Sequence, residues 1–347
     1  MIQTAIIGYG LSGQVFHGGL LETMSQFHVH TIITTDPAKK TLAKQHHPTA
    51  RVLDDPDTMI ADAAIELVVI STPNIHHHPL AKKALLSGKH VIVEKPFTVT
   101  SAEAEDLIHT AEKAGRMLTV YHNRRYDSDF LTLRQVIDSG ELGDIRLFES
   151  AYDRFRPDVN ASAWREMQLP GSGILYDLGA HLIDQALTLF GLPTSLYADV
   201  RSLRGGPVDD HFEIILDYPQ MKATLTSRPL IKEPLPRFAI HGSSGSFVKY
   251  GLDVQEADLK AGKRRKYDDW GHEPENLWGM LNTTDKRRRI PSLAGNYHGF
   301  YKAVYAHLTQ GTPLPITAQD GLHVIRLIEL AMASSEKGCR LTLQPME

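Results

Sequence analysis

Asp177 and His181 are the residues of this sequence whose types and spacing best suit proton transfer. They stand four positions apart in the segment 174–190, which has helical periodicity, so both side chains lie on one face of the expected helix. Neutral histidine accepts a proton near neutral pH and a carboxylate can orient it, although such a pair alone is more often structural than catalytic. Gly179 inside the same helix costs about 1 kcal/mol relative to alanine, which predicts a close approach of another group.

Lys95 is a candidate of a second kind, a positive charge. It lies in Glu94-Lys95-Pro96, directly after the apolar run 89–93, and thus at the carboxyl end of an expected parallel strand, where open α/β sheets bind ligands. Taken alone, it is better interpreted as a solvated loop residue. Together with the histidine–carboxylate pair, it instead suits a positive charge held over the reacting end of a ligand bound at this edge of the sheet.

A glycine-rich segment, Gly8-Tyr9-Gly10-Leu11-Ser12-Gly13, indicates that the protein binds a dinucleotide. It fits G-x-G-x-x-G, follows an expected strand and opens an expected helix, which is the context this motif requires. Gly8 permits a tight turn, Gly10 lets a pyrophosphate approach the backbone, and Gly13 lets the helix pack close to the strand. The N–H groups of the first helical turn would face the phosphates.

The end of the second expected strand, Ile33-Thr34-Thr35-Asp36, bears on which nicotinamide cofactor binds. Enzymes that use NAD favour an acidic residue there, because its carboxylate accepts hydrogen bonds from the ribose. If the strand ends at Ile33, Thr34 takes that position; if it extends two residues further, Asp36 does and would repel a 2′-phosphate. Thr34, Thr35 and the nearby Lys39 and Lys40 favour NADP, with NAD left open.

Short apolar runs alternate with amphipathic segments in the first 121 residues, a pattern typical of a parallel sheet with crossover helices. Helical spacing closed by a glycine occurs twice, where Gly88 and Gly115 are expected to end helices. The expected strands are 4–7, 29–34, 66–71, 89–93 and 117–121. The sequence therefore predicts an α/β fold whose first domain, residues 1–121, is a Rossmann dinucleotide-binding domain.

After residue 121 the pattern changes to strands that follow one another through short turns. Such an order predicts a mostly antiparallel sheet, so residues 122–347 are expected to form an α+β domain for substrate binding and oligomerisation. The expected strands are 145–154, 195–203, 211–218, 222–227, 237–241 and 246–250, and the expected helices are 127–139, 174–190, 296–310 and 318–337. Too few helices follow residue 194 to cover both faces of this sheet, which predicts an open face covered by a neighbouring subunit.

Together these motifs resemble those of the Gfo/Idh/MocA oxidoreductases, over essentially the whole chain. The resemblance rests on the glycine loop, Ser71-Thr72-Pro73-Asn74 with His77, Glu94-Lys95-Pro96 and the Asp177-x-x-x-His181 helix. Further segments, at 121–127, 175–181, 247–253 and 291–301, are similar to the branch of that family that oxidises scyllo-inositol with NADP. The resemblance implies hydride exchange between NADP and a cyclic polyol or sugar, in a homodimer or homotetramer formed through the second domain's sheet.

Carried over residue by residue, the family's catalytic residues fall on Lys95, Asp177 and His181. His181 would be the base, Lys95 would stabilise the developing alkoxide, and Asp177 would orient the substrate or the imidazole. The implied cofactor contacts are the glycine loop, Thr34, Thr35, Ser71, Thr72, Pro73, Asn74, His77, Glu94, Lys95 and Asn123, and Lys95 and Asn123 would also contact the substrate together with the catalytic pair.

Three further residues, Asp153, Arg154 and Trp164, are candidate polyol contacts from the segments 152–156 and 164–165. An arginine-rich loop held by ion pairs explains them equally well. The three consecutive histidines at 76–78 lack a carboxylate at ligand spacing, so no metal is expected.

Composition excludes several other classes of protein. With 37 Lys+Arg against 41 Asp+Glu in 347 residues, the net charge is −4, and a nucleic-acid binder would show a basic excess. No apolar run approaches the roughly 20 residues of a membrane helix, and the single cysteine, Cys339, cannot form an internal disulfide, so a cytoplasmic enzyme is expected. The remaining alternative is a dinucleotide-binding sensor, which would need none of the three catalytic candidates.

Overall fold

The computed structural model describes residues 1–160, 162–263 and 270–343, which form two compact units. The first comprises Met1–Asn123, Gln255–Trp270 and Tyr297–His323; the second comprises Arg124–Val254, Gly271–Asn296 and Val324–Glu347. This differs from the predicted division at residue 121, because two later segments belong to the first unit. Aromatic packing is the reason: the rings of Phe300 and Tyr301 lie 4.8 and 6.2 Å from that of Tyr121.

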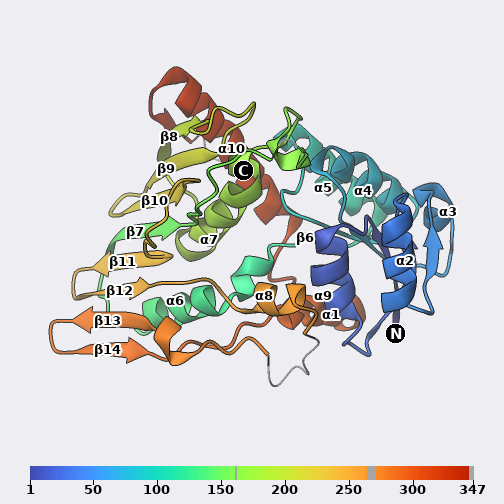
Figure 1. Ribbon diagram of the computed structural model, residues 1–347, viewed down its shortest axis with the longest axis horizontal. Helices are drawn as coiled ribbons and strands as arrows, with labels where there is room; N and C mark the ends of the chain where they lie inside the picture. The colour runs from blue at the N-terminus through green and yellow to red at the C-terminus, as the bar shows by residue number, and fades with distance from the viewer. Residues whose placement is uncertain (161, 264–269, 344–347) are drawn as a thin grey trace. The chain divides into compact units, whose positions relative to one another are not determined.

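Six strands form the sheet of the first unit, in the order β3-β2-β1-β4-β5-β6 (Figure 1). All neighbouring strands run parallel, which is the doubly wound order of a dinucleotide-binding sheet and confirms the Rossmann fold. The strands are β1 (Ile2–Ile7), β2 (Phe27–Ile33), β3 (Arg51–Leu53), β4 (Leu67–Ile70), β5 (His90–Val93) and β6 (Leu118–Val120). The edge strand β3 was not expected, since its three residues form no buried apolar run.

Helices cover the sheet of the first unit, so β4 and the three valine and isoleucine residues of β5 are fully buried. Helix α5 begins with a Thr100–Glu103 capping box and ends at Gly115, whose φ of 59° is left-handed, as predicted for a helix stop. The helices of this unit are η1 (Ser12–Gly18), α1 (Gly19–Leu21), α2 (Pro37–His46), α3 (Pro56–Ile60), η2 (Asn74–His76), α4 (His77–Leu86), α5 (Ser101–Ala114), α8 (Gln255–Lys260) and α9 (His298–Gln310).

Nine strands form the sheet of the second unit, in the order β14-β13-β12-β11-β7-β10-β9-β8-β15. Among its described strand pairs only β7 and β10 run parallel, which confirms a mostly antiparallel sheet. The strands are β7 (Ile145–Ala151), β8 (Ser195–Arg201), β9 (His211–Asp217), β10 (Lys222–Ser227), β11 (Phe238–Gly242), β12 (Gly245–Lys249), β13 (Gly279–Thr283), β14 (Arg287–Ile290) and β15 (Leu341–Thr342). The remaining helices are η3 (Asn123–Tyr126), α6 (Ser128–Asp138), η4 (Trp164–Glu166), η5 (Leu175–Gly179), α7 (Ala180–Phe190), η7 (Glu275–Leu277) and α10 (Ala318–Lys337).

Strands β13 and β14 arise in a polar stretch where no strand was expected. Leu281 of β13 is buried, whereas Arg287 and Arg289 of β14 are exposed. Arg288 forms an ion pair with Glu141 at 2.7 Å. Charged side chains are typical of strands near a sheet edge, and they conceal the apolar alternation that a sequence pattern needs.

Helices α6 and α7 lie against one face of this sheet (Figure 1). Leu216, Phe148 and Phe247 belong to the fully buried row of this sheet. Because side chains alternate along each strand, the adjacent row lies on the opposite face, in register across eight strands: Tyr197, Ile215, Thr224, Glu149, Ala239, Val248, Met280 and Arg289. None of the described helices combines the length and the apolar character that a membrane span requires.

Candidate functional site

The glycine loop has the geometry of a phosphate cradle. Gly8 has φ 91°, and a Cβ there would lie 2.3 Å from the Ser71 carbonyl oxygen. A Cβ on Gly13 would lie 2.1 Å from the carbonyl oxygen of Gly8, whereas one on Gly10 would meet nothing within 4 Å. The first and third glycines are therefore required by the fold, and the second faces open space, as a close approach by pyrophosphate needs.

Two hydroxyls beside this loop support a ligand site. Ser71 and Thr72 follow β4, and their buried hydroxyl oxygens have no hydrogen-bond partner among the described residues. Buried polar groups are normally hydrogen-bonded, so this pair fits a polar ligand at the loop. The residues present therefore suit a dinucleotide.

The other residues of the glycine loop differ in their surroundings, and two of them contact protein side chains. Tyr9 is buried with its hydroxyl 3.3 Å from Nδ1 of His46. Leu11 is exposed. Ser12 donates its hydroxyl hydrogen to the carboxylate of Glu94.

Glu94, which is expected near the cofactor, is the centre of a buried network. Its carboxylate lies 3.0 Å from Nε2 of His17 and accepts the backbone N–H of Lys95 at 3.0 Å, and Nδ1 of His17 lies 2.6 Å from the hydroxyl of Tyr301. Burial acts to raise the pKa of Glu94, but the hydrogen bonds and charge interactions with His17, Lys95 and Ser12 together outweigh burial and lower the pKa to about 2. The ionised carboxylate thus ties the residue before Lys95 to helix η1.

His77 connects two strand-end loops. Its Nδ1 lies 2.9 Å from the Pro96 carbonyl oxygen and its Nε2 lies 3.0 Å from that of Thr72. Burial lowers the pKa of this imidazole, so it is neutral near pH 7. Its position fixes the Pro96 turn beside Lys95, and both of its nitrogens face the protein backbone.

The end of β2 bears on the two positions considered for the acceptor, Thr34 and Asp36. The strand ends at Ile33, so Thr34 follows it directly. Asp36 caps helix α2 by accepting the N–H groups of Ala38 and Lys39 at 2.9 and 3.3 Å. The hydrogen bond from Lys39 lowers the pKa of this carboxyl, which is committed to its own helix.

Asp177 and His181 lie on consecutive turns, in η5 and at the start of α7. His181 is buried at 4% exposure, and Asp177 is half-buried with Arg165 Nε 3.3 Å from its carboxylate. Gly179 makes the predicted close approach, because a Cβ there would lie 2.8 Å from Leu175 and 3.4 Å from the Phe212 ring. The group that approaches is the protein's own core.

Asp209 is a residue at this turn that sequence analysis missed. Its carboxylate accepts the N–H of Leu175 at 2.7 Å, and a Cβ on Gly173 would lie 1.9 Å from it. Burial raises the pKa of Asp209 to about 6. It caps η5 from 34 positions away in the chain, a distance that hides the capping pattern seen in local sequence.

The three candidate polyol contacts have protein partners. Arg228 holds Asp153 with two hydrogen bonds of 3.0 and 2.8 Å. The guanidinium of Arg154 lies 5.0 Å from the Tyr152 ring, and that of Arg165 lies 4.7 Å from the Trp164 ring.

The two asparagines expected at the cofactor, Asn123 and Asn74, are buried at the starts of η3 and η2. No group of three metal-ligating side chains occurs in residues 1–160, 162–263 and 270–343.

Known proteins are similar to this chain over nearly its whole length. Residues 2–122 match the NAD-binding Rossmann fold of an oxidoreductase family, and residues 134–343 match its C-terminal alpha/beta domain. A scyllo-inositol 2-dehydrogenase (NADP(+)), IolW of Bacillus subtilis, is 40% identical over 99% of this chain and 96% of its own length. The uncharacterised oxidoreductase YdgJ of Escherichia coli is 43% identical over 99% of both.

Solved structures of oxidoreductases have the same fold over nearly the whole chain. The oxidoreductase YvaA of Bacillus subtilis has a TM-score of 0.95 at 39% identity and covers 99% of each chain. An oxidoreductase from Bacteroides fragilis has a TM-score of 0.90 at 42% identity over 99% of this chain and 100% of its own. With both domains matched and full-length relatives above 30% identity, this chain belongs to the Gfo/Idh/MocA oxidoreductase family and its first domain is a nicotinamide-dinucleotide-binding Rossmann domain.

Proposed function

We propose that this enzyme transfers a hydride between NADP(H) and a CH–OH carbon of a cyclic polyol or sugar, with scyllo-inositol and its 2-keto form as the first choice of substrate. The observation that carries the proposal is the full-length identity of 40% to an NADP-dependent scyllo-inositol 2-dehydrogenase in a chain that has Lys95, Asp177 and His181. A sensor protein would need none of these three side chains.

The end of β2 supports NADP over NAD. Thr34 stands where NAD enzymes favour a carboxylate, and its hydroxyl can donate to a 2′-phosphate. The carboxylate of Asp36 is bound to the N–H groups of α2 and lies 3.3 Å from Nζ of Lys39, which offsets its repulsion of a phosphate.

For the chemistry, we assign His181 as the base, Lys95 as the donor to the substrate oxygen and Asp177 as the orienting carboxylate. NADP supplies a nicotinamide that accepts hydride. During oxidation the C–H bond breaks and its electron pair leaves with the hydride, the hydroxyl proton moves to the imidazole of His181, and the carbonyl forms. The ammonium of Lys95 stabilises the negative charge that develops on the oxygen.

Initial rates with a panel of inositols and aldoses, each with NADP and with NAD, test this proposal. We expect turnover of at least one inositol, with kcat/KM higher for NADP. A protein that binds NADP yet oxidises no polyol and reduces no ketose in the panel would be a sensor, and the proposal would be wrong.

The open face of the second unit's sheet supports a homodimer or homotetramer. Its row contains two pairs of neighbouring apolar side chains, Tyr197 with Ile215 and Val248 with Met280, and apolar patches of this kind are uncommon on soluble monomers. Light scattering at micromolar concentration should show an oligomer, and Ile215→Asp should shift it toward monomer. A monomeric wild type contradicts this assignment.

A further inference from the structure

Helix α7 carries two buried polar side chains that the proposed chemistry does not use. Asp184 and Gln185 lie about one turn after His181 and are 2% and 0% exposed. Burying a charge or an amide is costly unless it is hydrogen-bonded. Both residues find partners in η3, the short helix that follows β6.

Asp184 is held by Arg125 in a two-pronged ion pair. Nε of Arg125 lies 3.1 and 2.9 Å from the two carboxylate oxygens, and Nη2 lies 2.6 Å from Oδ1. The planar guanidinium fork fixes the direction as well as the distance of its partner. The pair therefore restrains α7 both along and across its axis.

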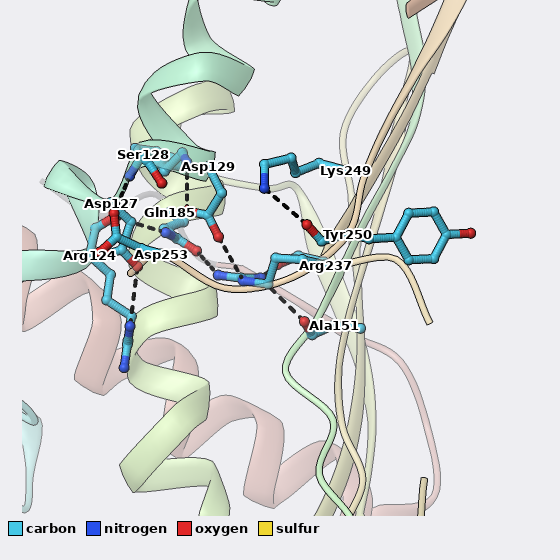
Figure 2. A network of polar contacts seen from close by, with 12 residues as sticks. Arg124, Asp127, Ser128, Asp129, Ala151, Gln185, Arg237, Lys249, Tyr250 and Asp253 are labelled. Atoms are coloured by element: carbon cyan, nitrogen blue, oxygen red, sulfur yellow. Dashed lines mark hydrogen bonds and ion pairs between the residues drawn. The ribbon is translucent and has the colours of Figure 1, made fainter. Parts of the chain in front are cut away.

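Gln185 is held from a second direction. Its Nε2 donates to the Arg124 carbonyl oxygen at 3.1 Å, and its Oε1 accepts from Nη2 of Arg237 at 2.6 Å. Figure 2 shows Arg237 pointing between Gln185 and Asp129, with a further bond toward Ala151 of the sheet. Arg237 also donates to the Ser150 hydroxyl at 2.6 Å, and its Nε lies 3.6 Å from the Asp129 carboxylate.

Consecutive helical residues point about 100° apart around the axis, so partners at positions 184 and 185 together fix the rotation of α7. We propose that Arg125 is a positioning residue for proton transfer, which acts through Asp184 to hold the helix that presents His181. This inference rests on the proposed function, in which His181 is the base. An error of about 1 Å in the position of a reacting group can lower a rate by about 100-fold.

The test compares two variants with a matched control. Arg125→Lys keeps the charge but loses the fork. Arg125→Gln combined with Asp184→Asn removes the pair without leaving a buried charge unpaired, which protects folding. The control is Arg288→Lys, because Arg288 holds Glu141 in a similar fork, with bonds of 2.9 and 2.7 Å, at the far edge of the sheet.

We expect the double variant to lower kcat for polyol oxidation by about 10- to 100-fold. Its KM for polyol and its Kd for NADPH, measured by fluorescence, should stay within about twofold of wild type, and Arg125→Lys should lose less activity. Arg288→Lys should match wild type. A wild-type kcat in the folded double variant, or an equal loss in the control, overturns the inference.

Amide hydrogen exchange provides a readout that needs no turnover. In the full-length double variant without substrate, the amides of 180–186 should exchange at least about 10-fold faster than in wild type or in the control, because local opening of α7 becomes easier. Unchanged exchange would contradict a positioning role. If wild type oxidises no polyol, the proposed function fails, while the exchange result still decides whether Arg125 holds this helix.

Discussion

The glycine loop of the first unit and helix α7 of the second unit are held in place by different means. In the first, the cradle at the glycine loop follows from backbone geometry, since side chains on Gly8 and Gly13 would collide with the carbonyl oxygens of Ser71 and Gly8. In the second, helix α7 is held by Arg125, 59 positions away in the chain, and by Arg237, 52 positions away. A site built from local backbone shape is visible in a short sequence motif, whereas a site held by distant ion pairs is not.

The largest effect should come from the side chains assigned to the chemistry. His181→Ala and Lys95→Met should each lower kcat for polyol oxidation by at least about 100-fold, with little change in the Kd for NADP. Because both act on one developing charge, the double variant should fall well short of the product of the single effects. Steady-state kinetics with a fluorescence-measured Kd check this, and full activity in His181→Ala would move the base elsewhere.

Two residues of the glycine loop, Gly10 and Gly13, separate an effect on cofactor binding from an effect on folding. Gly10→Val should fold normally and weaken NADP binding, since its side chain enters open space where pyrophosphate is expected. Gly13→Val should instead lower the thermal midpoint, because its Cβ meets the Gly8 carbonyl oxygen at 2.1 Å. Circular dichroism melts and NADPH titrations separate the two effects. Unchanged affinity in a folded Gly10→Val variant would remove this loop from the site.

The same contrast explains what could be predicted from the sequence. The Rossmann strands other than β3, and helix α10, followed from apolar periodicity, and α5 ends at Gly115 as its local pattern indicates. The end of β2 could not be decided, because Asp36 suits both a ribose contact and a helix cap. Asp209, Asp184 and β14 were missed because their partners are distant in the chain or their residues are charged.

Cofactor preference should respond to Thr34 and not to Asp36. Thr34→Asp places a carboxylate in the acceptor position and should shift the kcat/KM ratio toward NAD, by repulsion of the 2′-phosphate and by bonds to the ribose. Asp36→Asn should leave that ratio nearly unchanged, since its carboxylate caps α2. A switch of preference caused by Asp36→Asn alone would show that Asp36 reaches the ribose.

A smaller effect concerns pH and the cap of η5. The pKa of Asp209, about 6 through burial, lies above the ordinary value near 3.9 of an unfolded chain. The folded state therefore binds a proton on Asp209 more tightly than the unfolded state does. The protonated carboxyl contributes fully to folding stability below pH 4, and this contribution is lost as the pH rises through 6. Asp209→Asn, whose amide oxygen can still accept the Leu175 N–H, should gain on the order of 2 kcal/mol relative to wild type between pH 4 and pH 7. Urea unfolding across this range measures the difference, and a constant difference would show that the carboxyl does not titrate there.

Hydride transfer itself is the most direct test of the account. The enzyme is incubated with NADP and scyllo-inositol that carries deuterium on its ring carbons, and the reduced cofactor is analysed by mass spectrometry. The account predicts NADPH that is one mass unit heavier, formed at a rate that His181→Ala lowers by at least about 100-fold. Unlabelled NADPH, or no reduced cofactor with any inositol or sugar tested in the same way, would contradict it.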